Sequence, residues 1–451
     1  MSTELLAPLD LAFWHLESTA HPMHLGALAF FGGGDGSPDG EDLLALLAAR
    51  AAAVPRLHLV VRNVWLPVGG SAWAVAEDFD VRRHVRRILL PADGFAAEAT
   101  LLAGELMERP LARGLPPWEM YLLGADGGGE CAVLVKLHHA LADGMRAVAI
   151  GAGIFDQIAD AAPPGARGDG TEDPPSWLAR PGRAVDLARE RLGDVGQVLG
   201  IGASVVRAGR LRPLLPLPGT PDALSADSSG TRRLATAALG LDEVRRVRRA
   251  SGGTANDVLL AVVAGALRRW TAERDDPVTR DPRALVPVSR RRPGRTAASH
   301  GNRLSAYLLD LPVSEADPRA RLSAVRDGMA RNKAAGPSRG AGAVALLADQ
   351  LPAFASKWGA PLAGGAARAL FDVLVTSVPL PRTALSLGGR ELRAVYPMAP
   401  LARGQALAVA LSTYGGQVNV GLVADGKAVP DADGLADAMS EELADLVHRA
   451  R

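Results

Sequence analysis

Two adjacent histidines near the middle of the chain have side chains suited to catalysis. The stretch VLVKLHHALADGM begins as an apolar strand and ends with His138, His139, Asp143 and Gly144. An imidazole titrates near neutral pH, so it can act as a general base without special tuning. Asp143 would brace the loop through an arginine or cap the following helix. Gly144 would let the backbone turn where a side chain would clash.

The same histidines have two other interpretations. Either ring could be an ordinary core or surface group, as most histidines are. As metal ligands, both would have to reach one ion, but adjacent residues at the end of a strand project to opposite sides. No third His or Cys stands nearby at metal spacing, so we expect no metal site. The glycine directly after Asp143 implies a fixed loop geometry and favours catalysis.

Composition limits the classes of function open to the chain. It has 451 residues, 48% of them hydrophobic, so we expect two or three domains with a large buried core. The formal net charge is +1, which argues against nucleic-acid binding. Of the 50 basic residues, 46 are arginine, a bias typical of GC-rich genomes. Arginine clusters such as RRHVRR are therefore weak signs of a recognition surface.

The only cysteine, Cys131, can form no intramolecular disulfide, which fits a reducing cytoplasm. The N-terminal residues MSTELLAPLDLAFW lack the pattern of a signal peptide. The uncharged run 404–424 is long enough to span a membrane, but STYGGQVN interrupts it with turn residues and favours two strands joined by a hairpin. We expect a cytoplasmic protein, peripheral at most on the inner face of the cell membrane or on lipid droplets.

Strands and helices alternate along the chain, which predicts α/β layers around a sheet. The expected strands span residues 24–31, 59–68, 118–125, 131–137, 234–240, 283–289, 303–312 and 372–379, and the expected helices 40–54, 96–110, 145–160, 241–251 and 254–273. A Pro/Gly-rich stretch separates two such series. We therefore expect a domain over 1–160, a crossover linker with a helix over 161–230, and a second domain over 231–451. A site at their interface would follow the usual preference of pockets.

The stretch HHALADG resembles the HHxxxDG signature of acyltransferases related to chloramphenicol acetyltransferase and to peptide-synthetase condensation domains. Five further segments resemble, in family order, the bacterial wax ester synthase/diacylglycerol acyltransferase family. They are APLDLAFWHLESTAHPMHLG from Ala7, PPWEM from Pro116, NDVLLA from Asn256, RALVPVS from Arg283 and GNRLS from Gly301. The family's TNVPGP stands here as TSVPLP, Thr376–Pro381, and PPWEM has Pro117 in place of leucine.

The resemblance implies two chloramphenicol-acetyltransferase-like sheet domains with an active-site tunnel at their interface. It implies transfer of a fatty acyl group from acyl-CoA, the co-substrate, to diacylglycerol or a long-chain alcohol, with no other cofactor. His139 would take the hydroxyl proton of the acceptor in a direct ternary complex. His138 would be positional, and Asp143 would be a brace with Arg283 as one partner. Asn256 would stabilise the oxyanion or, equally, cap its own helix.

The residues expected to contact the substrates are Pro117, Trp118, Ser289, Asn302 and Thr376. SRRRPGR, 289–295, could meet the phosphates of CoA or be a solvated loop. The apolar segment 341–371 is core or an interfacial helix. GPSRG at 336–340 matches a nucleophile elbow, but no strand precedes it, so a covalent route is disfavoured. A different lipid acceptor and a non-catalytic lipid-binding protein on the same scaffold are the alternative functions.

Overall fold

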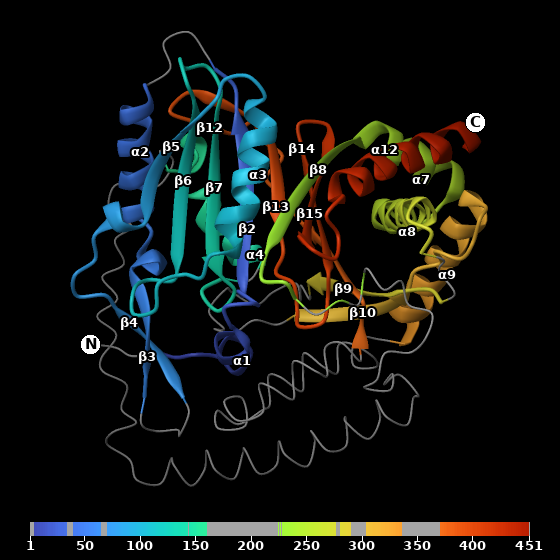
Figure 1. Cartoon of the computed structure of the whole chain (residues 1–451), viewed down its shortest axis with the longest axis horizontal. Coiled ribbons are helices and arrows are strands. Elements are labelled where there is room, and N and C mark those ends of the chain that lie inside the picture. The colour runs from blue at the N-terminus through green and yellow to red at the C-terminus, as the bar shows by residue number, and fades with distance from the viewer. Residues whose placement is uncertain are drawn as a thin grey trace, which may run out of the picture.

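Two six-stranded sheets organise the described part of the molecule, one in each half (Figure 1). The structure, a computed structural model, describes residues 4–33, 39–64, 70–142, 144–159, 224, 226, 228–276, 280–289, 304–335 and 370–450. The linker at 161–230 falls almost wholly outside these residues, as do GPSRG and most of the segment 341–371. Their expected structures stay predictions.

The first sheet contains the strand that leads to the two histidines. In sheet order its strands are β12 (Ser386–Leu387), β13 (Arg390–Met398), β2 (His24–Phe31), β7 (Cys131–His138), β6 (Trp118–Ala125) and β5 (Val85–Leu90). Every residue of β7 is buried, because the sheet is covered on both faces. β2 runs antiparallel to β7 and sets His24 opposite His138.

Successive side chains of these strands alternate between two hydrophobic layers. On one face, Val133 and Val135 pack in a cluster with α2 (Gly40–Ala52) and α4 (Gly144–Ala152). On the other, Leu134 packs in a cluster with α3 (Phe95–Glu108) and part of the second half. The first half also contains α1 (Pro8–Leu16) and the short α5 (Asp156–Ala159), whose Asp156 and Gln157 accept hydrogen bonds from the backbone at β12. A small antiparallel sheet of β1 (Glu4–Leu5), β4 (Ser71–Val75) and β3 (Leu59–Asn63) adjoins it, with the short helices η1 (Pro55–His58) and η2 (Val81–Arg83).

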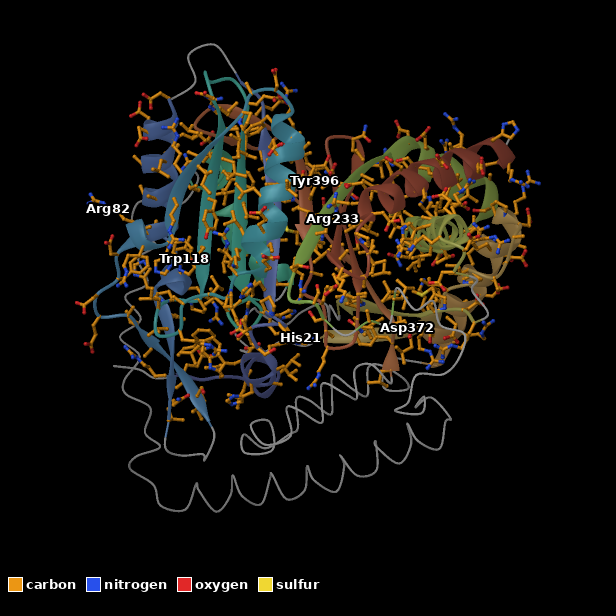
Figure 2. The ribbon with its side chains drawn as sticks, in the orientation of Figure 1. His21, Arg82, Trp118, Arg233, Asp372 and Tyr396 are labelled. Carbon is orange, nitrogen blue, oxygen red and sulfur yellow. The ribbon has the colours of Figure 1, made fainter. Side chains whose placement is uncertain are left out.

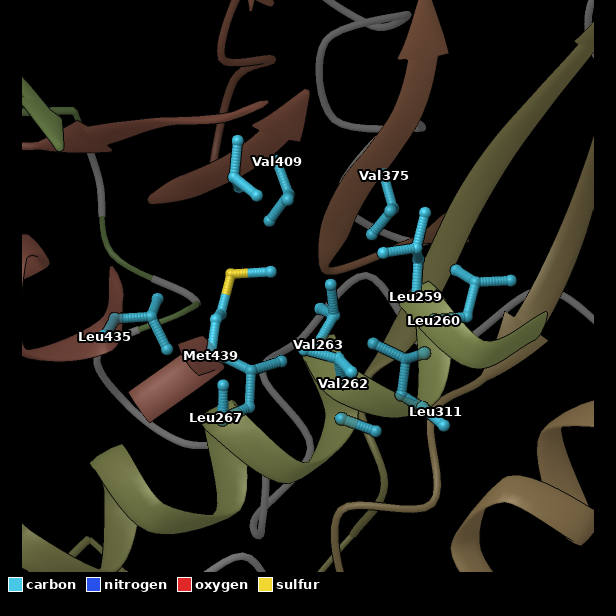
Figure 3. Packing of buried hydrophobic residues seen from close by; sticks show 14 of the residues in the cluster. Leu259, Leu260, Val262, Val263, Leu267, Leu311, Val375, Val409, Leu435 and Met439 are labelled. Carbon is cyan, nitrogen blue, oxygen red and sulfur yellow. The ribbon is translucent and has the colours of Figure 1, made fainter. Parts of the chain in front are cut away.

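The second sheet is covered by a layer of helices. In sheet order its strands are β10 (Leu304–Asp310), β9 (Arg283–Ser289), β11 (Val373–Val378), β14 (Leu407–Tyr414), β15 (Gln417–Asp425) and β8 (Arg232–Gly240). The helices are α7 (Leu241–Ser251), α8 (Ala255–Glu273), α9 (Pro318–Ala335) and α12 (Ala432–Arg449). Figure 3 shows the core of this half, in which Leu259, Val263 and Leu267 of α8 face the sheet and α12.

A capping box begins α8, the most buried of these helices. Thr254 accepts a hydrogen bond from the backbone of Asp257, whose carboxylate accepts one from the backbone of Thr254. The expectation that Asn256 caps this helix was therefore wrong. No single helix in the described residues is long and apolar enough to cross a membrane. α7 and α8 pass that test only together, bent by 103° at their break.

The predicted boundary at residue 231 needs one correction. β12 and β13 follow that boundary in the chain but belong to the first sheet, where β13 pairs antiparallel with β2. The sequence pattern assigned them to the second half because β14 and β15 follow directly. β13 instead crosses between the two sheets, so the chain segments of the two halves are interleaved.

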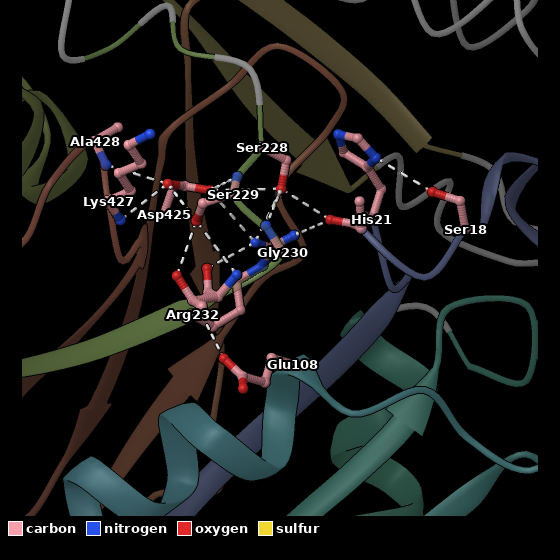
Figure 4. A network of polar contacts seen from close by, with 12 residues as sticks. Ser18, His21, Glu108, Ser228, Ser229, Gly230, Arg232, Asp425, Lys427 and Ala428 are labelled. Carbon is pink, nitrogen blue, oxygen red and sulfur yellow. Dashed lines mark hydrogen bonds and ion pairs between the residues drawn. The ribbon is translucent and has the colours of Figure 1, made fainter.

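Polar contacts also join the halves, beside the loop that precedes β2 (Figure 4). Arg232 and Ser228 each donate a hydrogen bond to the carbonyl of Ala20, both at 2.8 Å. The backbone of Arg232 donates to Glu108 at the end of α3, and its guanidinium lies 3.7 Å from Asp425. The second half thereby holds the loop of the first half that leads into β2, the strand paired with the one that ends at the two histidines.

Candidate active site

His139 stands in the turn that ends β7. Its backbone N–H donates to the carbonyl of Met23 at 2.8 Å, and the N–H of Leu141 donates to the carbonyl of His138 at 2.9 Å. The ring of His139 stacks on the ring of Phe13, with centroids 3.9 Å apart and an angle of 22° between the planes. Backbone and ring contacts together fix the direction in which this imidazole points.

A cavity of about 570 Å³ lies between the two halves, and His139 lines it. Its walls come from the first sheet, from α4 and from β9, β11 and β14 of the second sheet. Among the described residues that line it, none is Asp, Glu, Lys or Arg. His139 is thus the only ionisable side chain among the described residues of this wall. The other polar side chains that line it are those of Thr376, Ser377, Gln405 and Ser412.

Two of these polar groups already have partners within the protein. Ser412 donates to the carbonyl of Val395 at 2.7 Å, and the amide of Gln405 donates to the carbonyl of Phe371 at 3.2 Å. The large apolar wall suits a hydrocarbon substrate, and the few polar groups suit the orientation of a polar end. No group of three or more His, Cys, Asp or Glu side chains in the described residues is arranged to hold a metal ion.

His138 faces away from this cavity and is 1% exposed. Its Nδ1 accepts a hydrogen bond of 3.0 Å from the backbone N–H of Ala140, within the turn that carries His139. A neutral imidazole that accepts at Nδ1 carries its hydrogen on Nε2. That nitrogen lies 3.4 Å from Oε1 of Glu17. His138 therefore links the catalytic turn to a buried carboxylate.

Glu17 is the centre of a buried polar cluster behind the cavity. Its Oε1 lies 3.2 Å from Nε2 of His24 as well as near His138, and its Oε2 accepts a hydrogen bond of 2.5 Å from Arg113. Burial alone would raise the pKa of Glu17. Contacts with the imidazoles of His138 and His24 more than offset this effect and hold the pKa well below its usual range. Glu17 is therefore a permanent anion next to the turn.

Two further buried groups complete this cluster. Burial lowers the pKa of His24 to about 4, although the carboxylate of Glu17 acts in the opposite direction. Lys136 on β7 donates from Nζ to the carbonyls of Leu106 and Arg109, which are exposed by the end of α3. Burial lowers the pKa of Lys136 to about 8, against the raising effect of Glu119. A cation at a helix C-terminus is favourable, which explains a lysine in a buried strand.

Comparisons with known proteins identify the family. The model of the wax ester synthase/diacylglycerol acyltransferase catalytic domain matches residues 6–259, and that of the family's C-terminal domain matches 300–447. The chain belongs to the wax ester synthase/diacylglycerol acyltransferase family. It is an acyltransferase, and the sequence-based identification of the family and of the enzyme class is confirmed.

Relatives agree with this assignment over almost the whole chain. A probable diacylglycerol O-acyltransferase of Mycobacterium tuberculosis, tgs1, is 31% identical over 98% of this chain and 95% of its own length. The solved wax ester synthase/diacylglycerol acyltransferase from Marinobacter aquaeolei VT8 superimposes with a TM-score of 0.70 at 24% identity, covering 99% of each chain. A trichothecene 15-O-acetyltransferase from Fusarium sporotrichioides gives 0.62 at 12% identity, covering 98% of this chain and 94% of its own. These likenesses support the predicted two-domain α/β fold.

Within this family fold, the predicted site residues separate into those at the cavity and those away from it. His139 and Thr376 line the cavity, and His138 lies directly behind His139. Pro117 and Trp118 do not line it. Trp118 is 0% exposed, stacks on His84 and donates from Nε1 to the carbonyl of Leu57, deep in the first half (Figure 2). Their position favours a structural role, in which they support the sheet, and does not favour the predicted contact with substrate.

Other predicted residues are placed less directly. Asn256 lies in the first turn of α8 and does not line the cavity, so its oxyanion role gains no support. Gly144 begins α4, and Ser289 ends β9. Asp143 and Asn302 lie outside the described residues. Arg283, the suggested partner of Asp143, donates to Asp310 at 2.7 Å, and its pairing with Asp143 stays a prediction.

The sequence analysis assigned no role to Glu17, His24 or Phe13. All three belong to the segment from Ala7 that carried the family resemblance. The signal for Glu17 was a carboxylate at the end of an apolar helix, LDLAFWHLE, but nothing in spacing alone shows that it meets a strand residue more than a hundred positions later. Cys131 is buried, as expected.

Proposed function

We propose that this acyltransferase transfers a fatty acyl group from acyl-CoA to the free hydroxyl of diacylglycerol, forming triacylglycerol. The observation that carries the proposal is that His139 is the only ionisable side chain among the described residues that line a largely apolar cavity. The names of the mycobacterial relatives supply the acceptor class. Long-chain alcohols, which would give wax esters, are the second acceptor that this cavity suits.

In the proposed reaction, a ring nitrogen of His139 takes the hydroxyl proton as the acceptor oxygen attacks the thioester carbonyl. A carbon–oxygen bond forms, the tetrahedral intermediate collapses, and the carbon–sulfur bond breaks. The imidazolium returns the proton to the departing thiolate, so CoA leaves as a thiol. A positioned base of this kind contributes about 10²–10⁴-fold to the rate, and holding both substrates in one cavity adds the benefit of proximity.

The residues around His139 have supporting parts in this proposal. Phe13 holds the ring from one side. Glu17 fixes the Nε2–H form of His138, whose Nδ1 in turn holds the N–H of Ala140 within the catalytic turn. Thr376 lines the cavity and carries a hydroxyl that can donate to the oxyanion. Asp143 and Gly144 would shape the loop after the turn.

The substrates also suggest a place of work. Acyl-CoA is water-soluble, whereas diacylglycerol resides in membranes and lipid droplets. We therefore propose a cytoplasmic enzyme that acts at the inner face of the cell membrane or at droplet surfaces, without a cofactor besides the co-substrate acyl-CoA. Fractionation of cells with and without stored lipid tests this part.

The test of the activity uses purified full-length protein with palmitoyl-CoA and a diacylglycerol. We expect free CoA thiol and triacylglycerol in equal amounts, with the ester identified by chromatography. Hexadecanol replaces diacylglycerol in a parallel reaction to measure wax ester formation. Thiol release without any ester, or no thiol release with either acceptor, would contradict the proposal.

A further inference from the structure

Part of the cavity lies along the first sheet and leads away from His139, and we refer to this part as the branch. The lining residues Leu25, Ala27 and Ala29 follow one face of β2, and Leu25 is paired with Leu137, two residues before His139. From Leu25 to Ala29 the strand advances about 13 Å at about 3.3 Å per residue. On β13, Pro397 and Val395 line the same stretch, opposite Ala27 and Ala29. The branch therefore has a direction and a length.

Helix α4 supplies a further wall of this branch. It starts directly after the histidine turn and contributes Ala147, Val148, Gly151 and Ala152 to the lining. Ile154 and the ring of Phe155 also line the cavity beyond the end of α4, and Phe155 lies 6.2 Å from the ring of Phe31 at the far end of β2. The wall formed by α4 is thus made of small side chains, and bulkier ones follow it.

Gly151 is the smallest of these residues, and packing does not require a glycine there. An added Cβ at Gly151 would meet no atom within 4 Å among the described residues. At Gly26, by contrast, a Cβ would come within 2.9 Å of the sulfur of Met107. Gly151 is the last but one residue of α4, where glycine costs less than the roughly 1 kcal/mol of a helix interior. Its missing side chain leaves open space at the cavity wall.

We propose that this branch binds the acyl chain of the donor thioester and that Gly151 sets the chain length it accepts. The inference rests on the proposed function and assigns one substrate to one part of the cavity. A donor brings a single unbranched chain to His139, whereas a diacylglycerol brings two. A branch bounded by one sheet face and one helix suits the single chain.

Simple geometry gives the expected length limit. A C–C bond of about 1.5 Å at a near-tetrahedral angle advances an extended chain by about 1.25 Å. Gly151 is seven residues into α4, about 10 Å along its axis from the histidine turn at about 1.5 Å per residue. A larger side chain at this position would therefore obstruct the chain on the order of eight carbons from the carbonyl.

The experiment compares Gly151→Leu with wild type on octanoyl-, dodecanoyl- and palmitoyl-CoA at a fixed diacylglycerol concentration. We expect the ratio of kcat/KM for palmitoyl-CoA to that for octanoyl-CoA to fall at least about tenfold. Ala149→Leu is the matched control, because Ala149 is on the same helix but exposed and outside the lining. Gly151→Ala adds one methyl group, strengthens the helix and should give a smaller shift in the same direction. A ratio unchanged in both Gly151 variants would overturn the inference.

Two further measurements distinguish a wrong assignment of the branch from a wrong proposed function. With palmitoyl-CoA fixed and alcohols of eight to sixteen carbons varied, a shift in alcohol preference would assign the branch to the acceptor and overturn the donor assignment. Binding of S-octyl-CoA and S-hexadecyl-CoA, thioethers that cannot transfer a chain, is measured by calorimetry. Gly151→Leu should weaken only the longer ligand. This binding measurement needs no turnover. A wild-type enzyme without activity would therefore contradict the proposed function, while the binding data would still test the subsite.

Discussion

The two halves of the molecule bury polar groups in different places. In the first half, Glu17, His24, Lys136 and His138 gather at the ends of β2 and β7, directly behind the catalytic turn. In the second half the core between α8 and the sheet is apolar (Figure 3). One buried ion pair of this half, Arg321–Glu442 at 2.6 Å, joins α9 to α12 in the helix layer and does not line the cavity.

Two of the buried carboxylates, Glu442 in the second half and Glu17 in the first, show what this difference means. Burial raises the pKa of Glu442 above its usual range despite the nearby guanidinium of Arg321. Burial also acts to raise the pKa of Glu17, but two imidazoles reverse the result. Burying a charge costs free energy. The cluster around Glu17 offsets this cost with a role, because it holds the turn that positions His139. In the proposed mechanism the first half supplies the base, while the second half supplies cavity walls and holds the loop at Ala20.

The largest expected effect tests how tightly the halves are joined. Gly421 on β15 faces the carbonyl of Pro397 on β13, and a Cβ there would lie 1.9 Å from that oxygen. Gly421→Ala should lower the free energy of unfolding by about 3 kcal/mol or more, because the backbone must move. Urea denaturation followed by circular dichroism measures this.

Gly434 in α12 is the matched control. A Cβ there meets nothing within 4 Å among the described residues. Gly434→Ala should therefore leave stability unchanged or raise it by up to about 1 kcal/mol. Equal urea midpoints for the two variants would mean that the sheets do not touch as closely as the structure shows.

The second prediction concerns pH. The pKa of His24 is about 4 in the folded state and about 6.5 when unfolded. Between these pH values His24 binds a proton in the unfolded chain but not in the folded one. Its contribution to the free energy of unfolding is therefore complete above about pH 6.5 and is lost as pH falls toward 4. The loss from His24 is up to about 3 kcal/mol. Glu17, whose pKa is also lowered, adds to the loss at still lower pH.

A variant isolates this contribution. His24→Gln removes the titrating group, so its urea midpoint should change less between pH 6.5 and 4.5 than that of wild type. If the urea midpoints of wild type and variant changed equally with pH, His24 would not be the buried neutral group described above. No comparable loss is expected from Glu442, whose raised pKa acts with the opposite sign.

The third prediction has the smallest expected effect and compares the carboxylates of Glu17 and Glu442. Glu17→Gln keeps the shape but removes the charge that faces Nε2 of His138, so kcat should fall about tenfold, or about 1.4 kcal/mol in activation free energy. KM for acyl-CoA should change little, because Glu17 does not line the cavity. Glu442→Gln in the second half is the control and should leave kcat unchanged. If kcat fell as far in Glu442→Gln as in Glu17→Gln, the cause would be a general loss of structure and the special role of Glu17 would be contradicted.

Much of the fold could be predicted because periodicity reports burial. β2, β6, β7, α2, α7 and α8 were predicted to within a few residues, and the hairpin of β14 and β15 turns at Gly415 and Gly416 as expected. The partner of β13 was not predictable. Its sequence RELRAVYPM carries no sign that it pairs with β2, more than 350 residues earlier. Pairing between distant strands depends on the whole fold, which local propensity does not encode.

The site shows the same limit. The histidine motif predicted His139, and the structure places it in the cavity wall. The polar partners of His138 come from the loop after α1 and could not be read from spacing. Trp118 and Asn256 were carried over from family motifs, yet both lie away from the cavity. A motif records which residues a family keeps, whether they contact substrate or only hold the fold.

The most direct test of the central claim is the rate of CoA release by His139→Ala with palmitoyl-CoA and diacylglycerol at saturating concentrations. General base catalysis predicts a fall in kcat of at least about a hundredfold, with the circular dichroism spectrum and the binding of S-hexadecyl-CoA retained. A variant that turns over at the wild-type rate would remove His139 from the chemistry.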